Sequence, residues 1–146
     1  MVTDDEIRHH VYTATAAGGR PPHSDEVCVA LGVSQAEVLA GFARLRERRL
    51  LYLDAETGEI VMAPPFAAVP TTFLVTAGNR QYFANCVWDA YGIAAALHRD
   101  TAIEASCGCC GAPMALGVKN GTPVPRSGVA HFAVPAAHWW DDLPYT

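Results

Sequence analysis

The residues best suited to chemistry in this 146-residue chain are thiols, and three of its five cysteines lie within four positions. The segment Cys107-Gly108-Cys109-Cys110-Gly111 places closely spaced sulfur atoms on a glycine-rich turn. Thiolate sulfur is the ligand type that soft, thiophilic metals prefer. A structural zinc site needs a closed set of four ligands, usually in two pairs, and the second pair is missing here. The cluster therefore indicates a soft-metal site other than a zinc ribbon, or a tight turn whose cysteines are merely small.

A further thiol lies near a carboxylate in sequence. Cys86 and Asp89 are three positions apart in a segment whose apolar spacing predicts a helix over residues 81–98. Positions three apart on a helix share a face, so the two side chains are expected to be neighbours. A thiolate binds or attacks soft electrophiles, and a nearby carboxylic acid holds or delivers a proton. Taken alone, the pair is a weak signal, because this spacing is common by chance.

The N-terminal part of the chain predicts three helices followed by a hairpin. Apolar spacing and glycine breaks predict helices over residues 4–17, 24–29 and 35–46, and strands over residues 50–53 and 59–62. Ser24 and Ser34 are the expected N-caps of the second and third helices, and Cys28 occupies an apolar, core-facing position. This order is typical of a winged helix-turn-helix, and we expect a winged-helix-like lobe over residues 1–63.

The rest of the chain predicts a proline-containing linker over residues 64–70 and a second lobe over residues 71–146. Strands are expected at residues 71–76, 102–105, 114–118 and 129–134, together with the helix that carries Cys86. Asn120-Gly121 is a strong turn signal. The mixture of helices and strands predicts an α+β protein.

The composition and net charge of the chain limit the partners and the location that we expect for it. No apolar run reaches the roughly 18–20 residues that span a bilayer, and the acidic N-terminus differs from a signal peptide. An odd number of cysteines cannot all pair within one chain, which favours free thiols and a cytoplasmic location. The formal net charge of −5 and the few basic residues early in the third helix do not favour nucleic-acid binding. The N-terminal lobe is therefore interpreted as a packing module.

Several segments taken together resemble the organomercurial (alkylmercury) lyase family. They are Tyr82-Phe83-Ala84-Asn85-Cys86-Val87-Trp88-Asp89-Ala90, Ser106-Cys107, Gly111-Ala112-Pro113, His131-Phe132 and Trp139. The resemblance covers most of the chain and is strongest over residues 82–113. It implies a winged-helix-like N-terminal lobe and a C-terminal lobe of mixed strands and helices, in agreement with the order of elements above.

What the resemblance implies is cleavage of a carbon–mercury bond. Cys86 matches the family's first catalytic cysteine, and its thiolate would bind the mercury of an R–Hg⁺ substrate. Asp89 matches the family's aspartate, which would carry the proton that ends on the leaving carbon. Cys107 matches a further family cysteine with a structural part. No separate cofactor is implied: mercury is substrate and product ion, and external thiols would remove it.

One family residue has no counterpart in this sequence. The register places Ser127 where the second catalytic cysteine is expected, no cysteine follows Cys110, and the chain stops short of the family's usual C-terminal extension. Cys109 or Cys110 would then have to supply the second thiolate, so the candidate metal ligands are Cys86, Cys107, Cys109 and Cys110. The alternatives are a non-catalytic protein that binds Hg²⁺ or Cu⁺ and a metal-responsive regulator. A homodimer is compatible with the sequence.

Overall fold

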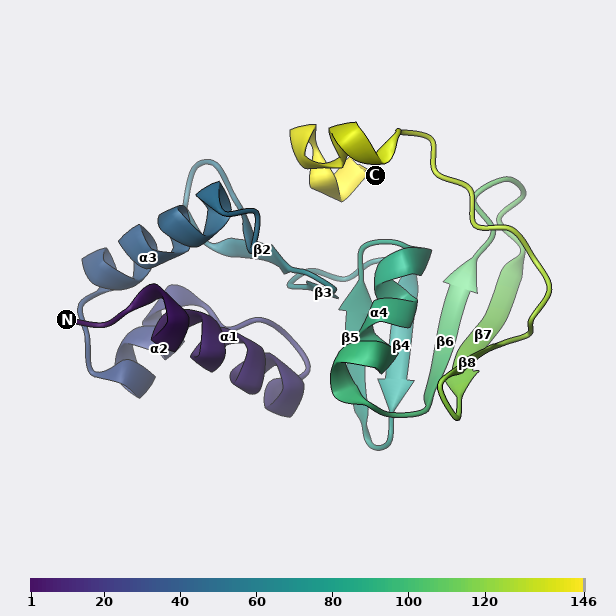
Figure 1. Cartoon of the computed structure of the whole chain (residues 1–146), viewed down its shortest axis with the longest axis horizontal. Coiled ribbons are helices and arrows are strands. Elements are labelled where there is room, and N and C mark those ends of the chain that lie inside the picture. The colour runs from purple at the N-terminus through teal and green to yellow at the C-terminus, as the bar shows by residue number, and fades with distance from the viewer. Residues whose placement is uncertain (146) are drawn as a thin grey trace. The chain divides into compact units, whose positions relative to one another are not determined.

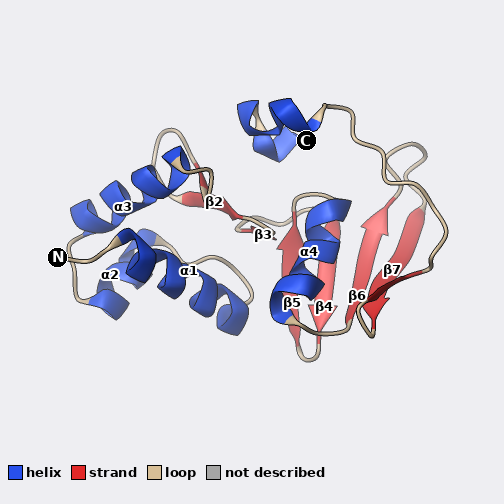
Figure 2. Ribbon diagram, in the orientation of Figure 1, coloured by secondary structure: helices blue, strands red, loops and turns tan. Residues whose placement is uncertain are grey.

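The computed structural model describes residues 1–145 and divides into two compact units, Met1–Val69 and Pro70–Thr146. Both units contain helices and strands, which confirms the predicted α+β class (Figures 1 and 2). Among the described residues, no single helix is long and apolar enough to cross a membrane. The helices Ser24–Leu31 and Gln35–Glu47 meet that length and composition only together, as a pair bent by 114°.

The first unit consists of three helices and three short strands. They are α1 (Asp4–Gly18), α2 (Ser24–Leu31), α3 (Gln35–Glu47), β1 (Tyr52–Leu53), β2 (Ile60–Ala63) and β3 (Phe66–Ala67). β2 pairs antiparallel with β1 on one side and with β3 on the other. The predicted order of three helices and a hairpin is therefore present. Its interpretation as a winged helix stays a prediction.

The starts of α2 and α3 show one correct and one wrong prediction of an N-cap. Ser34 caps α3, and its hydroxyl and the Glu37 carboxylate bond reciprocally to each other's backbone N–H groups, as in a capping box. Ser24, in contrast, is the first residue of α2, and His23 is the N-cap. Ser24 is buried, and both its backbone N–H and its hydroxyl donate to the Glu59 carboxylate. A tertiary contact with Glu59, the residue before β2, therefore replaces the expected local cap.

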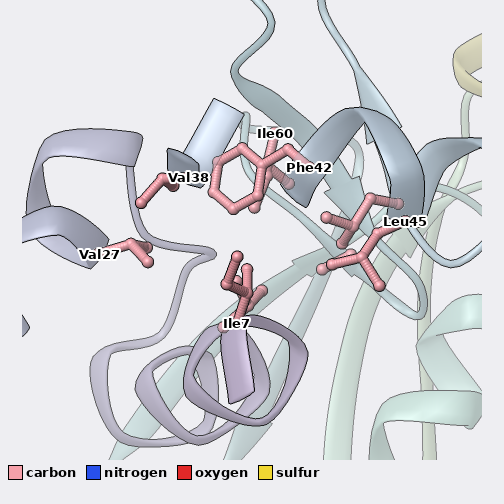
Figure 3. Close-up of a cluster of buried hydrophobic side chains, with 9 residues drawn as sticks. Ile7, Val27, Val38, Phe42, Leu45 and Ile60 are labelled. Atoms are coloured by element: carbon pink, nitrogen blue, oxygen red, sulfur yellow. The ribbon is translucent and has the colours of Figure 1, made fainter. Parts of the chain in front are cut away.

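Apolar side chains from all three helices meet the hairpin in one core (Figure 3). The buried members are Ile7, Val11, Val27, Val38, Phe42, Leu45, Leu51, Ile60 and Ala63. Cys28 is partly buried against this cluster, as expected for a small apolar side chain. Each Å² of apolar surface that is removed from water stabilises the fold by about 25 cal/mol. This core is therefore the main source of the unit's stability.

The segment predicted as a linker, residues 64–70, contains strand β3. Phe66 and Ala67 are each 2% exposed and pair with β2 across the two-residue turn Pro64-Pro65. Tyr12 fixes this turn, because its hydroxyl donates to the Pro64 carbonyl at 2.9 Å and its ring meets Phe66 edge-on. Proline content indicates irregular backbone, but it does not reveal that the intervening apolar residues are buried.

The second unit is an antiparallel sheet with one α-helix packed on it (Figure 1). Its elements are β4 (Phe73–Ala77), β5 (Arg80–Ala84), α4 (Val87–Leu97), β6 (Thr101–Ser106), β7 (Pro113–Lys119), β8 (Thr122–Val124) and the 3₁₀ helices η1 (Ala136–Asp141) and η2 (Leu143–Tyr145). Within this unit the strand order is β5-β4-β6-β7-β8. The main contacts of α4 within the sheet are with β4, β5 and β7. The N-terminus of α4 and the β6–β7 loop carry the candidate site.

The helix predicted over residues 81–98 is wrong in its first part. Residues 80–84 form β5, which pairs with β4 through contacts such as Val75 with Tyr82. α4 begins only at Val87. The buried side chains of Tyr82 and Ala84 alternate with Phe83, which is the period of a strand. Phe83 and Val87 are also spaced as on a helix, and that coincidence made the two elements look continuous.

The strand predicted over residues 129–134 is absent, and a strand that was not predicted, β8, pairs with β7. The predicted Asn120-Gly121 turn joins the two strands, with positive φ angles of 51° and 70°. β8 escapes detection because Pro123 lies in its middle. Proline is tolerated there because β8 lies at the edge of the sheet and need not donate outward.

Gly117 is expected to tolerate no side chain, because a Cβ atom there would meet the Thr101 carbonyl on the neighbouring strand β6. Gly117→Ala should lower the free energy of unfolding by about 1–3 kcal/mol, the usual cost of overpacking. Gly108→Ala is the matched control, because a Cβ atom there meets nothing within 4 Å. Urea unfolding measures both variants. Equal midpoints for the two would contradict the predicted close packing of β6 on β7.

Candidate functional site

The N-terminus of α4 brings Cys86 and Asp89 into contact. Cys86 is the N-cap of the helix, with extended backbone angles, and Asp89 lies in the first turn. The Cys86 Sγ–H donates to Asp89 Oδ2 at 3.3 Å, and both side chains are half-buried. The predicted proximity is correct, but its cause differs from the prediction. The thiol reaches the carboxylate from the capping position rather than from the helix face.

Burial shifts the protonation of both groups toward the neutral form. Burial first, and the Asp89 carboxylate second, raise the pKa of the Cys86 thiol to about 11, although the backbone N–H groups of Asp89 and Trp88 oppose this. Burial also raises the pKa of the Asp89 carboxyl group, and the hydrogen bond from Cys86 offsets part of that shift. At neutral pH the thiol therefore carries its proton, beside a carboxyl group that accepts a proton more readily than in water.

Asn85 attaches the C-terminal segment next to this pair. Its side-chain amide donates to the Leu143 carbonyl at 2.8 Å, and Leu143 is 8% exposed. Sequence reasoning gave Asn85 no role beyond its place in the resemblance. Contacts between residues 58 positions apart leave no local signal from which this one could have been predicted.

The loop between β6 and β7 holds the other three candidate cysteines. Two backbone hydrogen bonds of 2.8 Å close it, from the Cys107 N–H to the Ala112 carbonyl and from the Gly111 N–H to the Cys107 carbonyl. Gly111 takes a left-handed backbone with φ of 71°, which glycine adopts without strain. The predicted glycine-rich turn is therefore a closed loop that continues the β6–β7 pairing.

Neighbouring groups of the loop shift the protonation of the Cys107 thiol. The backbone N–H groups of Cys110 and Cys109, and then the Cys110 thiol, lower the pKa of Cys107. Cys107 is half-buried, whereas Cys109 and Cys110 are exposed. Cys86 and Cys107 thus have opposite tendencies, since the first holds its proton and the second loses its proton more easily.

An open cavity of about 860 Å³ adjoins the loop. Its lining includes Val87 and Tyr91 of α4, Cys107 and Cys109 of the loop, and Ser127 and His131 from the segment after β8. Cys86, Asp89 and Cys110 are not among the lining residues. Over residues 1–145, no three or more His, Cys, Asp or Glu side chains are placed to hold one metal ion. The structure brings Cys86 together with Asp89, and the set of four sulfur ligands stays a prediction.

The segment after β8 is irregular but internally fixed. The rings of Phe132 and Trp139 lie 5.0 Å apart between centroids, and Trp139 Nε1–H donates to the Val134 carbonyl at 2.8 Å. Residues 129–134 therefore lie in a loop before η1 rather than in the predicted strand. Ser127 and His131, just before it, therefore face the cavity from a loop.

The pKa shifts predict different reactivities for the two half-buried thiols. Because the thiolate is the nucleophile, iodoacetamide should alkylate Cys107 at lower pH than Cys86. Asp89→Asn removes the carboxylate that raises the pKa of Cys86, so its alkylation profile should move to lower pH. Mass spectrometry of the peptides that contain each cysteine measures both profiles. A Cys86 midpoint at or below about 8.5, the value of an unperturbed thiol, would contradict the raised pKa of Cys86.

Comparisons with known proteins agree with the resemblance in the sequence. A family model described as alkylmercury lyase matches residues 66–146, more than half of the chain. A similar solved structure is titled "Crystal structure of the mercury-bound form of MerB2", with 24% identity and a TM-score of 0.61. The match covers 81% of this chain and 58% of that chain, and at this identity it shows a shared fold. No curated protein matches the chain.

Proposed function

Because the chain belongs to the alkylmercury lyase family, we propose that it cleaves the carbon–mercury bond of organomercurials by protonolysis. The observation that carries the proposal is the 3.3 Å contact between Cys86 Sγ and Asp89 Oδ2. This contact joins a soft sulfur ligand for mercury to a carboxyl group with a raised pKa. Protonolysis needs both groups, one to hold the metal and one to supply the proton.

The first step is capture of the substrate by Cys86. The thiol is protonated at neutral pH, so binding of R–Hg⁺ must displace its proton as the sulfur–mercury bond forms. Asp89 Oδ2 already accepts the hydrogen bond from that thiol, so the proton passes to the Asp89 carboxylate. Burial favours the resulting neutral carboxylic acid. The thiol proton is thereby kept beside the bound substrate.

The second step returns this proton to the substrate. Sulfur coordination puts electron density on mercury, which weakens the mercury–carbon bond toward protonation. Asp89 then donates its proton to the carbon atom, R–H leaves, and Hg²⁺ stays on sulfur. The aspartate is ionised again, so no oxidant or reductant is consumed. External thiols remove the ion and regenerate the Cys86 thiol.

We assign the second thiolate to Cys109. Cys109 lines the same cavity as Val87, the residue that follows Cys86, whereas Cys110 does not. Ser127 also lines this cavity, but a hydroxyl oxygen is a hard ligand that suits mercury poorly. Of the two sequence candidates, this cavity lining favours Cys109 as the thiol that would share an ion with Cys86. Cys109→Ser should slow turnover more than Cys110→Ser does.

The test is release of hydrocarbon from a defined organomercurial. The purified chain is incubated with phenylmercury and excess thiol, and benzene is measured by gas chromatography. Benzene is expected from the unsubstituted chain and from Cys28→Ala, a matched control in the core of the first unit. Cys86→Ser should release none above the protein-free background. If the unsubstituted chain releases no benzene, the lyase proposal is refuted.

A second candidate function is sequestration of soft ions without catalysis. The presence of Ser127 in place of the family's second cysteine favours it, because one sulfur ligand fewer weakens the catalytic set. Stoichiometric Hg²⁺ binding without benzene release would identify this function. A cytoplasmic location and a homodimer stay predictions under either function.

A further inference from the structure

Regular elements and one loop share the lining of the cavity beside the β6–β7 loop. Tyr91 comes from α4 and Leu116 from β7, and residues 125–131 follow the end of β8. All of the lining residues belong to the second unit. The volume of about 860 Å³ falls within the range of about 300–1,000 Å³ that is usual for small-molecule sites. The cavity is therefore an open concave site within one unit, large enough for a small organic molecule.

Large apolar side chains line this cavity and are only partly covered. Met114 is 40% exposed and Val129 is 93% exposed, and both line the cavity. Val87 and Leu116 line it as well and are half-buried. A ligand that covers these side chains removes apolar surface from water, which favours binding in proportion to the area covered. The lining therefore favours a ligand with an apolar group.

Arg126 is the lining residue with a permanent charge. Its guanidinium stays protonated in proteins, and among residues 1–145 it forms no ion pair. None of the described residues that line the cavity is Asp or Glu. The chain as a whole has 15 acidic residues against 10 Lys and Arg residues. The cavity thus lacks the carboxylates that give the chain its net negative charge, and it presents one unpaired cation.

The polar groups of the lining indicate where an anion binds. Cys107 lines the cavity at the β6–β7 loop, and the backbone N–H groups of Cys110 and Cys109 lower the pKa of its thiol. A thiolate there repels an anion, so we expect the anionic group at Arg126 instead. A single guanidinium neutralises one negative charge, which matches a carboxylate better than a doubly charged phosphate.

From this lining we propose that the cavity binds a small carboxylate with an aromatic or similarly bulky apolar group, and that Arg126 pairs with the carboxylate. The planar guanidinium can donate two parallel N–H bonds to the two carboxylate oxygens. The apolar group lies against the side chains of Tyr91, Leu116 and Val129. Binding makes and breaks no covalent bond and requires no metal ion, so the site does not depend on the proposed lyase activity.

The test compares three probes by isothermal titration calorimetry on the reduced, mercury-free chain at pH 7. The first is 3-phenylpropionate, which has both groups. The second is 3-phenylpropanamide, which has the same shape without the charge, and the third is acetate, which lacks the apolar group. The acid should bind about ten- to a hundred-fold more tightly than the amide, the range for a hydrogen bond to a charged group. Acetate should bind more weakly than either.

Arg126→Gln assigns the preference to one side chain. This variant should bind the acid and the amide with equal affinity, while its affinity for the amide should match that of the unsubstituted chain. Arg80→Gln is the matched control, because Arg80 is also an exposed arginine of the second unit but does not line the cavity. It should keep the full preference for the acid. Circular dichroism of both variants checks that the fold is retained.

Val129→Ser tests the apolar part of the site. Val129 is so exposed that the substitution should leave the fold intact, and it should weaken binding of the acid and of the amide by the same factor. An unchanged affinity for both probes would contradict the placement of the apolar group.

Several results would overturn the proposal as a whole. They are no binding of 3-phenylpropionate at millimolar concentration, equal affinity of the unsubstituted chain for acid and amide, and a preference for the acid that survives Arg126→Gln. Tighter binding of phenyl phosphate than of 3-phenylpropionate would refute the carboxylate class. The titrations contain no mercury, so their outcome is independent of whether the chain releases benzene from phenylmercury.

Discussion

Asp89→Asn is expected to slow hydrocarbon release by about a hundred- to ten-thousand-fold, the range for loss of a positioned general acid. Asparagine keeps the shape of the side chain but cannot take the thiol proton from Cys86 or give it to carbon. Mercury capture should persist, because the Cys86 sulfur is unchanged. Benzene release and bound mercury are therefore measured on the same sample. The informative result is slowed benzene release while the bound mercury is unchanged.

The control for Asp89→Asn is Asp141→Asn. Asp141 is an exposed carboxylate whose partner, His138, is exposed as well, at 3.0 Å. Asp141→Asn should leave benzene release unchanged. If Asp89→Asn keeps more than about a tenth of the rate, Asp89 is not the proton carrier, since general acid–base catalysis contributes at least a hundred-fold.

Asp89→Asn should also stabilise the fold above neutral pH. Burial raises the folded-state pKa of Asp89 above its unfolded value, so ionisation opposes folding. The penalty is absent below the unfolded pKa of about 3.9 and develops as the pH rises through the folded pKa. Asp89→Asn should therefore raise Tm at pH 8 and have little effect near pH 3. A Tm gain that does not change with pH would contradict this account.

Phe42→Ala is expected to remove a large part of the stability of the first unit. Phe42 is fully buried at the centre of its core, and truncation of such a side chain costs about 3–5 kcal/mol. At about 0.05–0.15 kcal/mol per residue, a unit of this size has on the order of 3–10 kcal/mol to lose. Hydrogen exchange should show lost amide protection in α1, α2 and α3.

Val29→Ala provides the contrast for Phe42→Ala. Val29 is also a helical apolar residue, but it is 86% exposed, so its truncation should change stability by no more than about 0.5 kcal/mol. Equal protection in the two variants would mean that the cluster in Figure 3 does not hold the unit together.

Elements with local signals were predictable from the sequence. The capping box of Ser34 with Glu37, the left-handed Gly19 and Gly32 and the Asn120-Gly121 turn each act within a few residues. Strand assignments depend on distant partners, and there the predictions failed. β5 is a strand because it pairs with β4, and β8 forms because β7 offers it an edge.

At the site, too, the local contact was predictable from the sequence and the long-range contacts were not. The spacing of Cys86 and Asp89 correctly predicted a contact, and the family match confirms the resemblance on which their roles were assigned. The attachment of Leu143 to Asn85 was not predictable, because nothing near either residue indicates the other. The cavity was also not predictable, since its lining is drawn from strands, α4 and loops across residues 72–131.

The division into two units has a consequence for how this chain can change over generations. Every cavity-lining residue, and the Cys86–Asp89 pair, lies after Pro70, whereas the core around Phe42 lies before it. Substitutions in the first part are filtered by packing, which accepts any apolar side chain of suitable volume. Under the proposed function, substitutions around Cys86 and Asp89 are limited by the chemistry of mercury capture and proton transfer. The sequence of the first part should therefore change faster over generations than the sequence of the second part.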